Sequence, residues 1–381
     1  MKGASLPGVL TAGALVALAG CTSNETTADN AIAVTSSDTA CEVSSGQAPS
    51  GTLTFNVTNA GAQVTEFYLL AEDGLRILGE VENIGPGLRR DLVLAVPPGK
   101  YLTACKPGMT GDGIRAEFTI TDSGADLAAT GQFAEQIQQA ADTYAFYVKD
   151  QAEQLVADTD DFVEAYLAGD DDRARALYAP TRMHWERIEP VAESFGDLDP
   201  KLDLREADLE EGQDWTGWHR IEKDLWPPVD YRPMSPAQRQ KISKLLVADT
   251  ATLLSRVADQ TYRADQLGNG AKELLDEVAT GKVTGEEEAW SHTDLWDFQA
   301  NVDGARVAFD ALAPVVQGKD PELAQMLESR FDDVQAALDQ HRKGDGFVLY
   351  TDLSPNQVKR LAASVDALAE PLSQLTATVV T

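Results

Sequence analysis

A histidine and a glutamate three residues apart form the sequence feature best suited to binding a metal ion. They are His219 and Glu222, within the segment Trp215–Trp226. On a helix, residues at this spacing lie on the same side, so an imidazole and a carboxylate can converge on one ion. The alternative is an ordinary amphipathic helix with a solvated charged face, because a single pair at this spacing is common.

A second pair of acidic residues repeats the same spacing. Glu186 and Glu189 enclose the Arg-Ile dipeptide that also separates His219 from Glu222. Matched pairs on facing helices are how helical bundles build inward-facing carboxylate and imidazole sites. Asp203, in the polar loop between the two pairs, is the predicted further carboxylate. The sequence therefore predicts one ion site from these five residues, with solvated surface residues as the alternative.

A third acidic stretch, residues 286–297, carries another histidine. His292 or Asp297 is a candidate for closing the ion site from a further helix. Helix capping by Ser291 and Thr293, with packing by the nearby tryptophans, explains much of the same pattern. His292 and Asp297 are therefore additional candidate ligands.

Two cysteines in the first third of the chain define a separate candidate site. Cys41 and Cys105 are expected to form a disulfide if the protein is exported, which contributes roughly 2 to 4 kcal/mol of stability. The alternative is a thiolate metal site completed by Glu66. A blue copper site, which needs two imidazoles and a thiolate, is excluded here because the first histidine of the chain is His184.

Standard hydrolase motifs are absent from the sequence. The His-Glu-x-x-His motif does not occur, and its inverted form requires histidine where the chain has Lys223. We therefore expect that the protein is not an enzyme. Two alternatives stay open, a metal-dependent peptidase and a protein that binds acidic polysaccharide through a bridging cation.

Charge and the N-terminus bear on partners and location. The 381-residue chain has a formal net charge of −31, which opposes binding to nucleic acid or to an anionic membrane and favours cations. Residues 1–21 are predicted to be a lipoprotein signal peptide, because Leu18-Ala-Gly-Cys21 has the form of a lipoprotein cleavage box. Lipidation of Cys21 would make a lipid anchor the only membrane attachment, and plain secretion is the alternative.

Two structural periods divide the rest of the chain. Residues 22–40 have the composition of a flexible tether. Short runs of period two predict six or seven antiparallel strands in a sandwich at 41–122, and helical periodicity predicts a bundle at 128–381. After a first helical run from Phe133 to Tyr166, helices are predicted at 173–193, 207–224, 236–266, 271–280, 293–313, 321–343 and 355–379.

Three segments resemble the EfeO family of iron uptake proteins: His184–Pro190, Gly217–Glu222 and Ser291–Gly304. The resemblance implies a multi-domain fold, with a small all-β cupredoxin-like sandwich followed by an all-α imelysin-like helical bundle. It also implies capture of iron, ferrous or ferric, with copper or zinc as competing metals. The expected partners are an iron permease and a haem-type peroxidase of the same uptake system. The expected location is the cell envelope or periplasm, at the outer face of the cytoplasmic membrane.

The resemblance also assigns ligands. The Gly-x-His-x-x-Glu signature of imelysin-like domains matches Gly217, His219 and Glu222. The accompanying carboxylates of the family fall on Glu186, Glu189 and Asp203. In the sandwich, a second metal site is implied at Cys41, Glu66 and Cys105.

Overall fold

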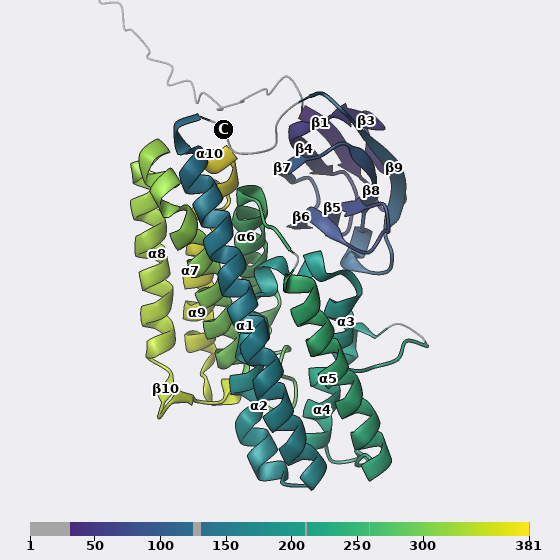
Figure 1. Cartoon of the computed structure of the whole chain (residues 1–381), viewed down its shortest axis with the longest axis vertical. Coiled ribbons are helices and arrows are strands. Elements are labelled where there is room, and N and C mark those ends of the chain that lie inside the picture. The colour runs from purple at the N-terminus through teal and green to yellow at the C-terminus, as the bar shows by residue number, and fades with distance from the viewer. Residues whose placement is uncertain (1–30, 125–130, 210–211, 259, 381) are drawn as a thin grey trace, which may run out of the picture.

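The computed structural model describes residues 31–124, 131–209, 212–258 and 260–380. A β-sandwich forms the first part and a helical domain the second (Figure 1). The predicted lipidation site, Cys21, lies outside the described residues. None of the described helices combines the length and apolar character needed to cross a bilayer.

The sandwich consists of two sheets whose facing side chains form one core. One sheet has the strand order β2-β1-β4-β7 and the other β3-β9-β8-β5-β6. Phe55 lies at the centre of this core, with its ring 5.3 Å from that of Phe67 and 5.6 Å from that of Phe118. The strands are β1 (Ala31–Ser36), β2 (Cys41–Val43), β3 (Gln47–Pro49), β4 (Gly51–Asn59), β5 (Thr65–Ala71), β6 (Ile77–Ile84), β7 (Arg89–Val96), β8 (Gly99–Cys105) and β9 (Ile114–Thr121), with the 3-10 turn η1 (Pro107–Met109) before β9.

The prediction of a flexible tether over residues 22–40 is wrong for its described part. Residues Ala31–Ser36 form β1, which pairs with β2 on one side and with β4 on the other. Its alternate residues Ile32, Val34 and Ser36 are buried. The period of two is present in the sequence, but small and polar residues between the apolar ones hide it. The pairings of β1 with β4 and of β3 with β9 are parallel, so the sandwich is mixed rather than purely antiparallel.

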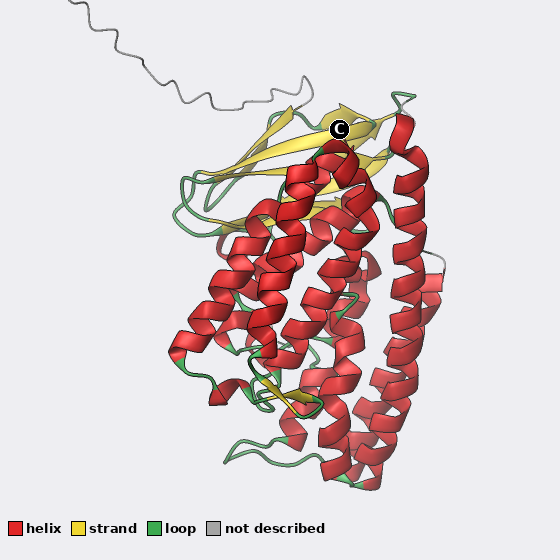
Figure 2. Cartoon of the chain, turned by 90° about the vertical axis from the view of Figure 1, so that its left-hand side faces the viewer, coloured by secondary structure: helices red, strands yellow, loops and turns green. Residues whose placement is uncertain are grey.

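The second domain is a bundle of long helices (Figure 2). Apolar positions at three- and four-residue spacing line one continuous core, as expected of amphipathic helices. The helices are α1 (Ala134–Ala168), α2 (Asp171–Glu186), α3 (Asp199–Leu202), α4 (Trp218–Leu225), α5 (Pro236–Ala258), α6 (Ala264–Thr280), α7 (Asp294–Lys319), α8 (Pro321–Asp339), α9 (Pro355–Leu372) and α10 (Leu375–Val380). Short 3-10 segments precede or join them: η2 (Gly131–Phe133), before α1, and then η3 (Glu189–Leu198), η4 (Glu206–Asp208), η5 (Lys282–Thr284) and η6 (Tyr350–Asp352).

The helical prediction differs from the structure mainly around the candidate site. The helix predicted at 207–224 is only the short α4, because the described residues 212–217 are irregular. The helix predicted at 173–193 ends at Glu186 and continues as the 3-10 segment η3. The bundle also contains a small hairpin of β10 (Arg342–Lys343) and β11 (Gly346–Phe347), so it is not purely helical.

Helix α6 joins the two domains by packing against β6 and β7. Its Asp265 accepts a 2.9 Å hydrogen bond from the backbone N–H of Ala95, and Asn269 donates one of 2.9 Å to the carbonyl of Val93. The strands β6 and β7 are the edges of their sheets. The helix therefore covers backbone groups that an exposed sheet edge would leave unpaired.

Candidate metal centre

Gly217 places the histidine of the candidate site. It precedes α4 with a φ of 83°, and a Cβ at this position would lie 2.1 Å from the carbonyl oxygen of Leu202 in α3. Only glycine tolerates both the conformation and the close approach. The start of α4 is thereby held against the end of α3, where Asp203 lies. Trp218 fixes the helix in the core, with its ring 5.4 Å from that of Phe162.

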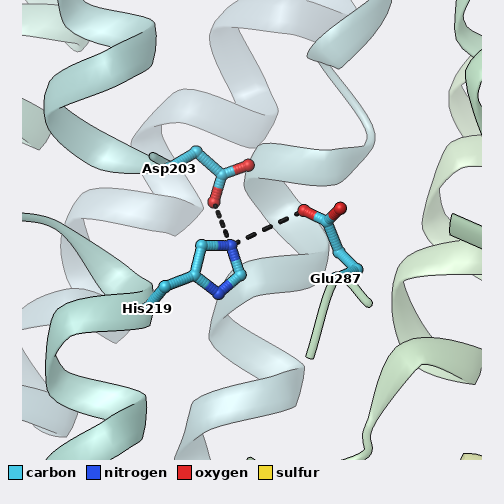
Figure 3. A group of neighbouring side chains, drawn as sticks. All are labelled: Asp203, His219 and Glu287. Carbon is cyan, nitrogen blue, oxygen red and sulfur yellow. Dashed lines mark ion pairs between the residues drawn. The ribbon is translucent and has the colours of Figure 1, made fainter. Parts of the chain in front are cut away.

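The imidazole of His219 lies among several carboxylates (Figure 3). Its Nε2 is 3.3 Å from Oδ1 of Asp203 and 3.5 Å from Oε1 of Glu287, the two ion pairs drawn in Figure 3. Its Nδ1 is 3.3 Å from Oε2 of Glu222. Two groups of three residues have ligand atoms within 4.8 Å of one another: Asp203, His219 and Glu287, and His219, Glu222 and Glu288. One nitrogen with hard oxygen donors suits a transition-metal cation such as iron.

Glu222 is held in place by backbone groups. Its Oε1 accepts hydrogen bonds from the N–H groups of Trp290 at 2.9 Å and Ser291 at 2.7 Å. Glu288 accepts a 2.7 Å hydrogen bond from the Ser291 hydroxyl. The segment preceding α7 therefore orients carboxylates from two different elements toward the same imidazole, as ligand-supporting groups do in metal sites.

A fully buried arginine lies between the carboxylates. Arg182 of α2 donates to Asp203 and to Glu186, and its Nε lies 2.6 Å from Oε1 of Glu288. Its Nη2 is also 3.7 Å from Oε1 of Glu287. The guanidinium compensates the repulsion between acidic groups that would otherwise be buried without a counter-charge.

A buried lysine holds the other predicted pair. Nζ of Lys282 is 3.0 Å from Oε2 of Glu186 and 2.7 Å from Oε2 of Glu189. Asn301 donates to both carboxylates, at 3.0 and 2.6 Å. In the described part of the chain, Glu186 and Glu189 belong to neither group of candidate ligands around His219. They form an adjoining part of the same network, connected to His219 through Arg182.

The surroundings set the charge of the central residues. Burial and the charge of Arg182 act to lower the pKa of His219, but the carboxylates of Asp203, Glu222 and Glu287 beside its ring raise it well above 6.5. Burial raises the pKa of Asp203, yet the Arg182 charge holds it well below its usual range. Burial also acts to raise the pKa of Glu287, but the nearby positive charges, that of Lys282 above all, lower it to about 2. These shifts favour the protonated form of the imidazole, ion-paired with the carboxylates around it.

Other carboxyl groups of the centre are protonated more readily than usual. Burial, followed by repulsion from Glu222, raises the pKa of Glu288 well above its ordinary value. Burial, followed by repulsion from Glu186, does the same for Glu189. A cation that binds here must displace protons from the ligands, so its affinity falls as the pH falls.

Two family profiles and several named relatives match this chain. A family profile described as imelysin matches residues 140–375, and one described as a cupredoxin-like domain matches residues 10–120. Proteins named "Iron uptake system component EfeO" are 35% identical in Yersinia pestis and 36% identical in Escherichia coli K12, each over 90% of this chain and 90% of the relative. This chain belongs to the EfeO family.

The resemblance to the EfeO family expected from the sequence is thus confirmed. A crystal structure of a protein described as an iron-regulated protein A precursor, from Parabacteroides distasonis, is similar in fold to this EfeO-family chain. It has a TM-score of 0.52 at 16% identity and covers 67% of this chain and 98% of its own. At that identity the likeness concerns the fold alone.

The additional candidates His292 and Asp297 of this EfeO-family chain lie in different surroundings. His292 has a positive φ of 57°, and its backbone N–H donates a 2.9 Å hydrogen bond to the carbonyl of Glu288. Its ring is in neither group of candidate ligands. Asp297 is buried, and its Oδ1 lies 3.8 Å from Nε of Arg182. The structure thus brings Asp297 to the edge of the centre, beside the arginine rather than the histidine.

In the sandwich, Cys41 and Cys105 form a disulfide that joins strand β2 of one sheet to strand β8 of the other. Both cysteines therefore lack the thiolate that the alternative metal site requires. Glu66 is buried, accepts a hydrogen bond from Tyr68, and lies 3.7 Å from Nζ of Lys106. The disulfide was one of the two alternatives drawn from the sequence of this EfeO-family chain, and it is the one that the structure contains.

A cavity of about 590 Å³ between the two domains reaches the candidate centre. Asp203, Glu287 and Glu189 lie in its wall on the helical side, and Glu80 and Glu82 line it from the sandwich. Eleven acidic and three basic side chains line the cavity in total. A cavity lined by an excess of one charge raises the local concentration of ions of the opposite sign. It therefore favours the approach of cations to the centre.

Sequence reasoning missed four residues of this EfeO-family site. Glu287 and Glu288 lie in a run of three glutamates, a pattern typical of a solvated face, although that run was noted as an acidic patch. Arg182 and Lys282 are basic residues, a type usually expected at the protein surface from sequence alone, yet both are buried. Their only sequence signal is their closeness to the glutamate pairs and to the glutamate run.

Proposed function

We propose that this EfeO-family protein captures iron outside the cytoplasmic membrane and passes it to a permease of the same uptake system. The observation that carries the proposal is the buried convergence of His219 with Asp203, Glu222, Glu287 and Glu288. A structural ion pair needs one counter-charge, whereas this imidazole is in contact with several carboxylates. An oxygen-rich donor set with one nitrogen suits ferrous or ferric iron better than copper or zinc held by thiolates.

The route to the centre supports the same function. The acidic cavity between the domains lets a hydrated cation reach Asp203 and Glu287, and it disfavours anions. The ion is cargo in this proposal, so the site must release it as well as bind it. Protonation of the ligands provides a means of release, because the same oxygens bind either a proton or the metal.

Calorimetric titration with ferrous iron under anaerobic conditions tests the capture step. We expect the purified protein to bind iron and the double variant His219→Ala, Glu222→Ala to lose that binding. The matched control is His184→Ala. His184 is also a buried histidine, but its ring nitrogens contact Gln151 and Asp158, away from the centre. Unchanged iron affinity in the double variant would overturn the site assignment.

Delivery and location need separate tests. We propose that the protein is exported and held at the outer face of the cytoplasmic membrane by a lipid on Cys21, with a haem-type peroxidase as a further partner. The substitution Cys21→Ala should move the protein from the membrane fraction to the soluble fraction, as measured by fractionation of the cells that express it. Iron-loaded protein should supply iron to vesicles containing the permease faster than the double variant does. Equal rates would argue against delivery.

A further inference from the structure

Arg182 and an incoming ion would compete for the same oxygen atoms. Oδ1 of Asp203 is the atom that faces Nε2 of His219 and also accepts from Nη1 of Arg182. Oε1 of Glu287 likewise lies 3.5 Å from the same imidazole nitrogen and 3.7 Å from Nη2 of the arginine. A metal ion bound to those oxygens would therefore have a fixed positive charge as its nearest neighbour, which opposes binding.

The structure also contains a second acceptor for this guanidinium. Asp297 is 1% exposed, and in the described part of the chain neither of its carboxylate oxygens has a hydrogen-bond partner. Its Oδ1 lies 3.8 Å from Nε of Arg182, whose nearest carboxylate oxygen is Oε1 of Glu288 at 2.6 Å. Leaving a buried carboxyl group without a hydrogen bond is costly, so such a group marks an unused interaction. A small rotation of the guanidinium would satisfy it.

We propose that Arg182 is a tethered placeholder cation. In the ion-free protein its guanidinium neutralises Asp203, Glu287 and Glu288. When iron arrives the guanidinium moves to Asp297, while its Nη2 stays bonded to Glu186. This proposal rests on the proposed function. It assigns Arg182 and Asp297 a role in positioning charge, and neither residue is a ligand.

The exchange would also select the class of ion. A monovalent cation replacing the guanidinium brings the same charge and fewer hydrogen bonds, so the arginine retains the oxygens. A divalent or trivalent cation adds charge to a site with excess carboxylates and can displace it. The centre would therefore discriminate against the abundant monovalent cations sodium and potassium. The basis of this discrimination is the charge of the ion and not its size.

The first test replaces the placeholder with an uncharged side chain of similar length. Arg182→Met should bind ferrous iron more tightly than the wild type, by roughly tenfold, a value within the range for directly coupled groups. Its ion-free form should melt at a lower temperature, because buried carboxylates lose their counter-charge. Arg182→Lys, which keeps the charge, should show little gain in affinity. An affinity of Arg182→Met that is unchanged or weaker would overturn the proposal.

The second test uses Asp297→Asn in a double-mutant cycle. Asp297→Asn should weaken iron binding several-fold in the wild type and have no effect in the Arg182→Met background, because its role depends on the arginine. If Asp297 were a ligand, the loss would be equal in both backgrounds, and the proposal would be wrong. If Arg182→Met does not fold, the Nε–H NMR signal of Arg182 in the wild type tests the exchange instead. This signal is identified by its absence from the spectrum of Arg182→Lys. It must shift when iron binds to the wild type, and an unchanged signal would refute the exchange.

The outcomes separate this proposal from the proposed function. A wild-type protein that binds no iron removes the proposed function and the placeholder with it. A wild type whose iron binding depends on His219 and Glu222, combined with Arg182→Met that binds no more tightly, refutes the placeholder alone.

Discussion

Replacing Lys282 with methionine should destabilise the ion-free protein strongly. Its Nζ is buried and lies within 3.0 Å of Glu186 and Glu189. Burial acts to lower the pKa of Lys282, but these two carboxylates raise it well above its ordinary value, so the side chain is charged at neutral pH. Lys282→Met keeps the bulk of the side chain and leaves both carboxylates without this counter-charge.

The magnitude follows from the burial of the pair. Removing one partner of a buried ion pair costs about 3 to 5 kcal/mol, whereas an exposed pair contributes about 0.3 to 0.5 kcal/mol. Lys149→Met is the matched control, because Lys149 and Glu153 are four residues apart on α1 and their side chains are 52% and 55% exposed. For a helical domain of this size, the loss predicted for Lys282→Met lowers the melting temperature by roughly 6 to 20 °C.

Thermal unfolding of the ion-free proteins, followed by circular dichroism, measures this difference. The double variant Lys282→Met, Glu189→Gln should recover part of the loss, because it removes one of the two uncompensated carboxylates. The reasoning is refuted if Lys282→Met costs no more than Lys149→Met. It is also refuted if Glu189→Gln brings no recovery in the Lys282→Met background.

Three further predictions concern residues around the centre and the disulfide. Burial raises the pKa of Asp294 from 3.8 to about 7, so this carboxyl favours folding below pH 3.8 and progressively loses that contribution as the pH rises through 7. Asp294→Asn should therefore gain stability relative to the wild type by at most roughly 4 kcal/mol at pH 8 and by less at pH 5, as denaturant unfolding would show. Gly217→Ala should lower both the melting temperature and the affinity for iron, because the added Cβ would overlap the backbone of Leu202. Gly169 is the control, because it has a similar φ of 76° and a Cβ there would meet no other atom within 4 Å. Gly169→Ala should therefore retain iron binding. Cys41→Ser with Cys105→Ser should lower the unfolding free energy of the sandwich by about 2 to 4 kcal/mol, since the bond closes a loop across a sequence separation of 64, and an unchanged denaturation midpoint would contradict this.

The sequence predicted the two domains because each has a clear period. Phe55 and Val57 alternate with polar residues, and Phe133, Ile137 and Tyr144 recur at helical spacing. The segment around the site was predicted less well. The start of α4 is fixed by the close approach of Gly217 to the backbone of Leu202 in α3. This is a contact between two separate elements, so the local sequence pattern cannot indicate it.

The candidate site was predicted in part for a similar reason. His219, Glu222 and Asp203 lie together as predicted from the sequence, since spacing and the intervening loop carry that information. The approach of Glu287 and Glu288 depends on how the segment before α7 packs against α4, through the bonds of Glu222 to that segment. Burial of Arg182 in the same centre is a consequence of tertiary packing, which a pattern of charged residues does not contain.

Anomalous diffraction at the iron edge, from crystals loaded with ferrous iron, tests the central claim most directly. The account predicts an iron peak at coordination distance from His219, with oxygen ligands drawn from Asp203, Glu222, Glu287 and Glu288. Iron bound instead beside Glu66 in the sandwich, or crystals with bound iron elsewhere and no peak at His219, would contradict it.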